Sequence, residues 1–196
     1  MQIIAHRRNT RVELAATPRE HGVEIDLRTE RGQLILHHDP FAEGELFEAW
    51  LEQYEHGTLI LNVKEEALEA AVLTLLQRRG LADFFFLDQS FPFLLRSARA
   101  GERRCAVRVS EYESIDTALG LAGQLDWVWV DCFTRFPLDR KQALALRAAG
   151  FKLCLVSPEL QGRAAPAEIS GMRQWLGEQG IVPDAVCTKY AERWGT

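Results

Sequence analysis

The sequence lacks long hydrophobic runs, and this absence excludes several classes of protein. None of its apolar runs approaches the roughly 18 residues that a membrane-spanning helix needs, so we expect no membrane span. The first residues, MQIIAHRRNT, hold too short an apolar run for a signal peptide. We therefore expect a cytoplasmic protein.

The sequence also lacks an excess of positive charge. Its formal net charge is −5 and its pI is about 5.6 over 196 residues. The protein as a whole is therefore not attracted to nucleic acid or to anionic lipid, and we expect no nucleic-acid partner. An anionic ligand would have to be bound by a local group of cations. The oligomeric state stays open.

Cysteine is scarce, and no two cysteines form a CxxC pair. The four residues are Cys105, Cys132, Cys154 and Cys187, and each lies in or at the end of an apolar run. This pattern favours small core residues in a reducing cytoplasm. A zinc site is not expected, because closely spaced ligands are missing.

Nothing in the sequence divides the chain. It contains no linker rich in Pro, Gly or Ser, no internal repeat and no low-complexity segment. With 47% hydrophobic and 26% charged residues, the composition is typical of a globular protein. We therefore predict a single domain over residues 1–196.

Eight short apolar runs alternate with longer amphipathic segments. The runs are often apolar on both faces, which is typical of parallel strands covered by helices. They cover residues 2–5, 23–27, 58–63, 84–87, 105–109, 127–130, 151–156 and 184–188. Helices are predicted over residues 41–57, 65–80, 139–150 and 165–180. A further apolar run at 33–37 predicts a short extension after the second strand.

The repeated order of strand and helix predicts an α/β fold, a (β/α)₈ TIM barrel. The barrel would be near its minimal length, because about 250 residues are typical of this fold. An open, doubly wound parallel sheet is the alternative architecture.

Polar residues follow most of the predicted strands, where barrel enzymes place their active sites. Glu24 and Asp26 are two residues apart on one strand, so both side chains point to the same face. They would repel each other unless a divalent cation lay between them. Asn62 and Lys64 on the next strand could provide an oxygen ligand and a phosphate contact. An ion-pair network without metal is the alternative interpretation.

Two histidines lie at neighbouring strand ends. His6 follows the first strand, and His38 follows the extension of the second, so the pair could act as general base and general acid. Because adjacent residues of a strand face opposite ways, we expect only one of His37 and His38 to enter the site. Arg108, at the end of a later strand, is expected to line the mouth of the site.

Three segments of the sequence resemble the motifs of the glycerophosphodiester phosphodiesterase family. They are IAHR at 4–7, GVEIDLRTERGQLILHHDP at 22–40 and LNVK at 61–64. The resemblance implies a (β/α)₈ barrel that cleaves a small-molecule phosphodiester with two histidines. It also implies one divalent cation as cofactor, Mg²⁺ or Ca²⁺.

The resemblance also implies roles for individual residues. His6 and His38 take the places of the acid/base pair, and Glu24 and Asp26 take two metal-ligand places. Asn62 takes a third ligand place that the family fills with an acidic residue, so metal affinity should be lower.

Arg7 and Lys64 take the phosphate-contacting places, and we add Arg108 as a phosphate-binding candidate. The loops that define the glycerol pocket in the family are short in this sequence. The expected substrate is therefore a glycerophosphodiester-like or a sugar or polyol phosphodiester. A barrel that binds a phosphorylated metabolite without cleaving it is the alternative, and a lyase that stops at a cyclic product is a third possibility.

Overall fold

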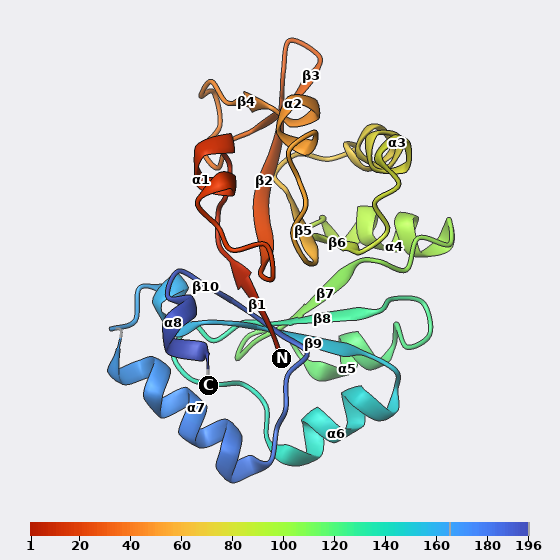
Figure 1. Ribbon diagram of the computed structural model, residues 1–196. Helices are drawn as coiled ribbons and strands as arrows, with labels where there is room; N and C mark the ends of the chain where they lie inside the picture. Colours follow the sequence, from red (N-terminus) through yellow and green to blue (C-terminus); the bar gives the residue numbers. More distant parts are fainter. Residues whose placement is uncertain (165, 196) are drawn as a thin grey trace. The chain divides into compact units, whose positions relative to one another are not determined.

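The structure is a computed structural model that describes residues 1–164 and 166–195, and it divides into two compact units (Figure 1). We call residues 5–96 the N-terminal unit, and residues 1–4 with 97–196 the C-terminal unit. Each unit contains a sheet with parallel strands and flanking helices, so the protein has a mixed α/β fold. The single domain stays a prediction.

The sheet of the N-terminal unit has the strand order β4-β3-β2-β5-β6. Its strands are β2 (Gly22–Glu30), β3 (Gln33–Leu36), β4 (Glu45–Leu46), β5 (Leu59–Val63) and β6 (Phe84–Leu87). Strands β2, β5 and β6 are parallel, whereas β3 and β4 are antiparallel additions. The helices are α1 (Arg11–Ala15), α2 (Phe47–Leu51), α3 (Glu69–Arg79) and α4 (Phe91–Arg99).

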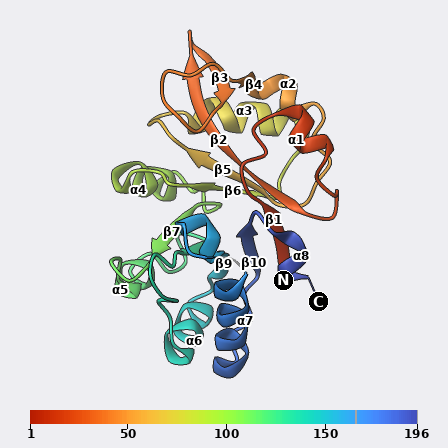
Figure 2. The same ribbon diagram turned by 90° about the vertical axis from the view of Figure 1, so that its left-hand side faces the viewer.

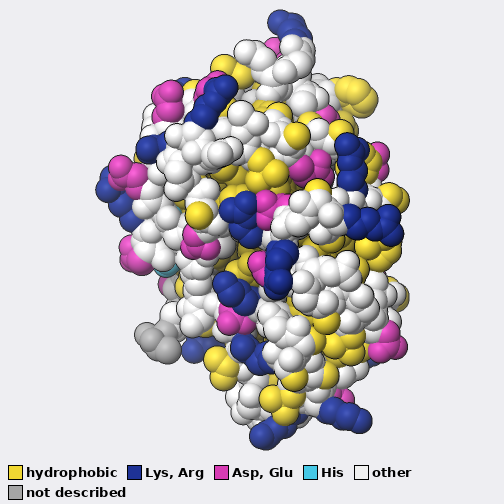
Figure 3. All heavy atoms as spheres, turned by 90° about the vertical axis from the view of Figure 1, so that its right-hand side faces the viewer, with side chains coloured by type: hydrophobic (Ala, Val, Ile, Leu, Met, Phe, Trp, Pro, Cys, Tyr) yellow, Lys and Arg dark blue, Asp and Glu magenta, His cyan; other side chains and the backbone are white. Residues whose placement is uncertain are grey.

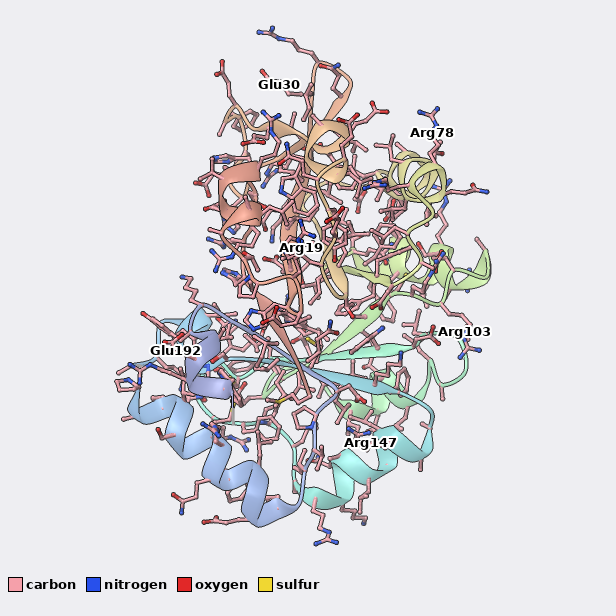
Figure 4. The ribbon with its side chains drawn as sticks, viewed as in Figure 1. Arg19, Glu30, Arg78, Arg103, Arg147 and Glu192 are labelled. Carbon is pink, nitrogen blue, oxygen red and sulfur yellow. The ribbon has the colours of Figure 1, made fainter. Side chains whose placement is uncertain are left out.

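Strands β2 and β3 form a hairpin that brings the chain back to the middle of β2. Its two-residue turn is Arg31-Gly32, and both residues have positive φ, 48° and 79°, as the tight hairpin turn requires. Figure 4 shows Glu30 near the tip of this hairpin. At the other end, the N–H of His37 donates to the carbonyl of Asp26 over 3.1 Å. The hairpin therefore places the His37–His38 pair beside the strand that carries the predicted carboxylates.

The sheet of the C-terminal unit has the order β1-β10-β9-β8-β7, and β7 to β10 are mutually parallel. Its strands are β1 (Gln2–Ala5), β7 (Ala106–Val109), β8 (Trp127–Val130), β9 (Lys152–Val156) and β10 (Ala185–Thr188). Its helices are α5 (Ile115–Leu119), α6 (Arg140–Ala148), the 3₁₀ helix η1 (Pro158–Gln161), α7 (Ala167–Gln179) and α8 (Ala191–Trp194). In Figures 1 and 2, α6 and α7 lie on the same side of this sheet.

All eight predicted strands are present, and the run at 33–37 forms β3. The helices predicted over 65–80, 139–150 and 165–180 are present as α3, α6 and α7, although residue 165 lies outside the described residues. Closure into a barrel stays a prediction.

The long helix predicted over 41–57 is wrong, because this segment holds only β4 and the five-residue α2. Gly44 lies so close to β3 that a Cβ there would be 2.5 Å from the Leu36 carbonyl oxygen. This close approach fits β4 pairing and leaves room for only one short helix. Phe47, Trp50 and Leu51 of α2 are nevertheless buried, as the apolar spacing predicted.

The remaining sequence predictions concern the cysteines, the surface and the membrane. All four cysteines are buried and none is part of a disulfide, which confirms that they are core residues. On the face drawn in Figure 3, basic and acidic side chains are interspersed. At the periphery, Arg103 pairs with Asp126 at 2.9 Å (Figure 4). Within the described part of the chain, every helix is too short or too polar to cross a membrane.

Candidate active site

Two carboxylates are buried in the central strand of the N-terminal unit. Glu24 and Asp26 lie on β2 with 1% and 0% of their surface exposed, and their alternate positions direct both to one face. In the parallel register, Asp26 is opposite Asn62 of β5. The structure thus brings together the residues that their positions on neighbouring strands predicted to be close. Buried carboxylates are costly without compensating partners, so those partners define the site.

Arg7 provides two of these partners. Its backbone N–H donates to Oε2 of Glu24 over 2.9 Å, and its Nε lies 3.6 Å from Oδ2 of Asp26. Arg7 has a φ of 51°, a left-handed conformation that costs a non-glycine residue roughly 1–3 kcal/mol. This strain turns the backbone N–H towards one carboxylate while the guanidinium reaches the other.

Asn9 holds Asp26 at two points, and the sequence analysis did not identify it as a site residue. Its Nδ2 donates to Oδ2 of Asp26 over 2.9 Å, and its Oδ1 accepts from the Asp26 backbone N–H over 2.8 Å. The next residue, Thr10, begins α1 with a capping box to Glu13. The helix cap thus fixes the loop that carries Asn9 to the strand.

Strand β5 contributes an amide and an ammonium group. Asn62 Nδ2 donates to Oε1 of Glu24 over 2.9 Å, and Lys64 Nζ lies 3.3 Å from Oδ1 of Asp26. Lys64 also lies 3.7 Å from Asp88, which follows β6 and has a φ of 59°. Within residues 1–164 and 166–195, Oδ1 of Asn62 is buried and has no hydrogen-bond donor, whereas Oδ1 of Asp26 has the Lys64 ammonium group as its ion-pair partner.

The electrostatics of the site leave Glu24 poorly stabilised as an anion. Burial and the charge of Asp26 raise its pKa from 4.5 to about 7. Hydrogen bonds from Asn62 and the Arg7 N–H, and the charge of Lys64, oppose this rise only in part. A further positive charge at this position would favour the ionised carboxylate.

The two predicted histidines occupy different surroundings. His6 is 13% exposed, and its Nε2 lies 3.9 Å from Oε2 of Glu24. His38 is more open, and its Nδ1 lies 2.7 Å from Oδ1 of Asp39, whose pKa is lowered by that hydrogen bond. The His38 carbonyl accepts two hydrogen bonds from Arg28, which fixes the backbone at the end of the hairpin.

A pocket of about 570 Å³ opens beside these groups in the N-terminal unit. Arg7, Asn9, His38 and Asp39 contribute to its lining, so Arg7 both contacts the buried carboxylates and faces the pocket. His37 lines the pocket as well, and the expectation that only one histidine would face the site is wrong. Strand β3 ends at Leu36, so the alternation of side chains no longer applies to residues 37 and 38.

Comparison with known proteins identifies the fold. No protein-family model matches the chain, and no curated protein matches its sequence. A glycerophosphoryl diester phosphodiesterase structure from Parabacteroides distasonis aligns with a TM-score of 0.68 at 14% identity, covering 98% of this chain and 84% of that chain. A glycerophosphodiester phosphodiesterase structure from Agrobacterium tumefaciens aligns with a TM-score of 0.67 at 14% identity, covering 99% of both chains. The chain has the fold of the glycerophosphodiester phosphodiesterases.

This fold alone does not define an activity. A mutant tryptophan synthase α-subunit from Pyrococcus furiosus also aligns, with a TM-score of 0.61 at 10% identity, covering 97% of this chain and 88% of that chain. The phosphodiesterase fold confirms the family resemblance at the level of architecture. Function has to be argued from the side chains of the site.

The side chains partly fit the divalent cation that the phosphodiesterase resemblance implies. In the described residues, no three His, Cys, Asp or Glu side chains are grouped so that they could hold a metal ion. Two carboxylates and one amide do converge, through Glu24, Asp26 and Asn62, and hard cations prefer such oxygen donors. The Asn62 oxygen that has no hydrogen-bond donor, and the Asp26 oxygen that already faces the Lys64 ammonium group, are suited to a cation.

Arg108 belongs to the C-terminal unit and is bound by carboxylates there. Its Nη1 donates to Oδ2 of Asp131, and its Nε lies 3.8 Å from Glu113. Its role in binding phosphate stays a prediction. The remaining predicted residues, from His6 to Lys64, all lie in the N-terminal unit.

Proposed function

We propose that the protein is a phosphodiester hydrolase that depends on a divalent cation, Mg²⁺ or Ca²⁺. The substrate would be a glycerophosphodiester or a sugar or polyol phosphodiester. One observation carries the proposal: Arg7 contacts both buried carboxylates and also lines the pocket that contains His38. A phosphate group in that pocket would therefore lie next to a guanidinium and an imidazole, and the same guanidinium contacts the buried carboxylate pair.

In this proposal, Glu24, Asp26 and Asn62 would hold the cation. The bound cation would draw negative charge from a phosphate oxygen and so favour departure of the leaving alcohol. When no metal ion is bound, the charges of Arg7 and Lys64 neutralise Asp26. Once a metal ion neutralises the carboxylates, the side chains of Arg7 and Lys64 would contact the phosphate instead. Two positive charges would then lie where the transition state gains negative charge.

His6 and His38 would transfer the protons. One imidazole accepts the proton of the attacking hydroxyl group, and the other donates a proton to the leaving oxygen. Asp39 supports His38 in this role, because its hydrogen bond to Nδ1 fixes the ring and leaves Nε2 for the substrate. A substrate hydroxyl as nucleophile would give a cyclic phosphate, and water would give the open monoester.

We further propose that the eight parallel strands close into one (β/α)₈ barrel, and that residues 1–196 act as a single domain. Alignment over nearly the whole chain with phosphodiesterase structures supports this architecture. Four buried cysteines that form no disulfide support a reducing compartment such as the cytoplasm.

Metal binding can be tested without measuring activity. Titration of the EDTA-treated protein with Mg²⁺ or Ca²⁺ should raise the melting temperature, by mass action. Asn62→Ala should weaken this response because it removes a ligand. Lys64→Met should strengthen it, because the ammonium group competes with the cation for Asp26, although the same change should reduce hydrolysis. Equal responses of all three proteins would contradict the proposed site.

Hydrolysis is tested with bis-p-nitrophenyl phosphate and glycerophosphodiesters, with products identified by ³¹P NMR. His6→Ala and His38→Ala should each lose roughly 10²–10⁴-fold in kcat. A cyclic end product would instead favour the lyase.

The alternative function is binding of a phosphorylated metabolite without cleavage. Asn62 favours it, because an amide replaces the acidic ligand of the family and no three acidic or imidazole ligands converge in the described residues. Saturable binding of glycerol phosphate with no turnover under either metal would establish this alternative.

A further inference from the structure

A glycine in the interior of α7 has no packing explanation. Gly171 belongs to a helix that runs from Ala167 to Gln179, where glycine is less favourable than alanine because its backbone is more flexible when unfolded. A Cβ at this position would meet no heavy atom within 4 Å. The missing side chain therefore leaves open space on this face of the helix.

That space is part of a pocket of about 330 Å³, which we call the α7 pocket. Met172 and Trp175 line it on the helix, and Arg135 and Phe136 line it from the loop that follows β8. The volume is at the lower end of the roughly 300–1,000 Å³ of small-molecule sites, and such sites are mostly apolar with few polar groups. Trp175 is 41% exposed, so part of its indole ring is available for contact.

The loop wall of the α7 pocket is held in place by one carboxylate. Glu111 accepts hydrogen bonds from the backbone N–H groups of Phe133, Thr134 and Arg135, over 3.2, 2.7 and 2.7 Å. These bonds fix the backbone immediately before Phe136. The pocket is therefore preformed on both sides, by a helix and by an anchored loop.

The charges at the α7 pocket favour an anionic ligand. Arg163 is already engaged, because it pairs with Glu168 and donates to the Cys132 carbonyl over 3.3 Å. Arg135 differs, since no carboxylate within residues 1–164 and 166–195 lies within ion-pair distance of its guanidinium. The Arg135 guanidinium therefore places one positive charge, without an acidic partner in the described residues, beside an aromatic and largely apolar surface.

We propose that the α7 pocket binds a small, flat aromatic carboxylate. The carboxylate would pair with Arg135, and the ring would lie over Gly171 against the indole of Trp175. This inference is independent of the proposed hydrolase function, because none of the pocket residues belongs to the candidate active site.

The test uses 2-naphthoate as the probe and neutral 2-naphthamide as its isostere. Binding to the ¹⁵N-labelled full chain is followed by NMR, through the Gly171 amide and the Trp175 indole N–H. Gly171→Ala should weaken naphthoate binding about tenfold or more, because the methyl group fills the floor of the pocket. Arg135→Gln should weaken naphthoate about tenfold and leave naphthamide unchanged, because only the carboxylate loses a charged partner.

Gly177→Ala is the matched control. Gly177 lies in the same helix, its Cβ position is also open, and it does not line the α7 pocket. Both alanine variants should raise the melting temperature, but only Gly171→Ala should weaken binding. The proposal is overturned if naphthoate shifts neither resonance, if Gly171→Ala binds as tightly as Gly177→Ala, or if Arg135→Gln affects both probes equally.

Discussion

Both units contain carboxylates within or directly after their strands, but these carboxylates are hydrogen-bonded differently. In the C-terminal unit, Asp131 accepts from Arg108 on Oδ2, and from the Cys132 N–H and Gln161 Nε2 on Oδ1. Glu159 accepts from three donors on neighbouring segments. Every oxygen of these two carboxylates has a protein donor, so they hold strands and loops together.

The buried carboxylate site of the N-terminal unit is less completely hydrogen-bonded. Within the described residues, Oδ1 of Asn62 is buried without a hydrogen-bond donor, and Oδ1 of Asp26 has only the ion pair with Lys64. Buried polar atoms in native proteins almost always have partners, so a water molecule or a ligand would satisfy the Asn62 oxygen. The difference between the units teaches that carboxylates in and after strands are informative only after their hydrogen bonds have been counted.

The largest expected effect is that of Asp26→Asn on hydrolysis. The change keeps the shape of the side chain but removes the charge that faces Arg7 and Lys64, and we expect roughly a 10²–10³-fold loss of kcat/KM. The amide also removes the acceptor that Asn9 or Lys64 faces, but relief of the repulsion with Glu24 offsets that loss. The free energy of unfolding should therefore fall by only about 1 kcal/mol. Steady-state kinetics and urea unfolding measure the two quantities.

The matched change in the other unit is Asp131→Asn, and it should reverse this pattern. An amide nitrogen cannot accept a hydrogen bond, so either Arg108 or the Gln161 and Cys132 donors lose their partner. We expect the free energy of unfolding to fall by about 3 kcal/mol. The kcat/KM of the folded protein should fall less than about tenfold. A large kinetic loss with unchanged stability would contradict the contrast and favour a catalytic role for Arg108.

The pH dependence of stability should also differ between the units. In the metal-free protein the pKa of Glu24 is raised from 4.5 to about 7, so between these values the native state keeps a proton that the unfolded state has lost. Stability should therefore fall as the pH rises through this window, by up to about 3 kcal/mol. Glu24→Gln should remove this fall, as measured by urea unfolding in EDTA.

Glu111 should show the opposite slope. Burial alone would raise its pKa, but hydrogen bonds from the Arg135 and Thr134 N–H groups lower it to about 2. Its contribution is present above pH 4.5 and is lost as the pH falls towards 2. Glu111→Gln should remove this loss of stability at acid pH, and it should leave the fall in stability between pH 4.5 and 7 unchanged. If Glu24→Gln and Glu111→Gln change the pH dependence of stability over the same pH range, the assigned difference between the two carboxylates is wrong.

The sequence predicted the strands well, because runs rich in Val, Ile and Phe are buried on both faces in parallel sheets. It predicted one helix wrongly, over 41–57, because apolar spacing could not reveal that Gly44 packs against the Leu36 carbonyl. Tertiary contact decided the structure of that segment. The β2–β3 hairpin could have been predicted from the Arg31-Gly32 turn, since glycine favours the positive φ that the turn requires.

The candidate site was predicted in part, for a similar reason. Glu24 and Asp26 were found because strand alternation fixes their common face from local sequence. Asn9 was missed, because its partner Asp26 is 17 residues away and only the fold brings them together. The carboxylate partners of Arg108 could not be predicted from local sequence patterns either, because Asp131 is 23 residues away.

The smallest expected effect concerns the outer carboxylates that share a cation with a buried one. Asp88 shares Lys64 with Asp26, and Glu113 shares Arg108 with Asp131. Both outer carboxylates are partly exposed, so Asp88→Asn and Glu113→Gln should each change the free energy of unfolding by about 1 kcal/mol or less.

Only Asp88→Asn should change the binding of inorganic phosphate, measured by calorimetry at low salt. Removing one competitor for Lys64 should tighten phosphate binding by up to about fivefold, the equivalent of one weak ion pair. Glu113→Gln should bind phosphate as the unmodified protein does, because Asp131 still accepts a hydrogen bond from Arg108. Tighter binding in Glu113→Gln alone would assign the phosphate contact to Arg108 instead of Lys64, and would move the anion site to the C-terminal unit.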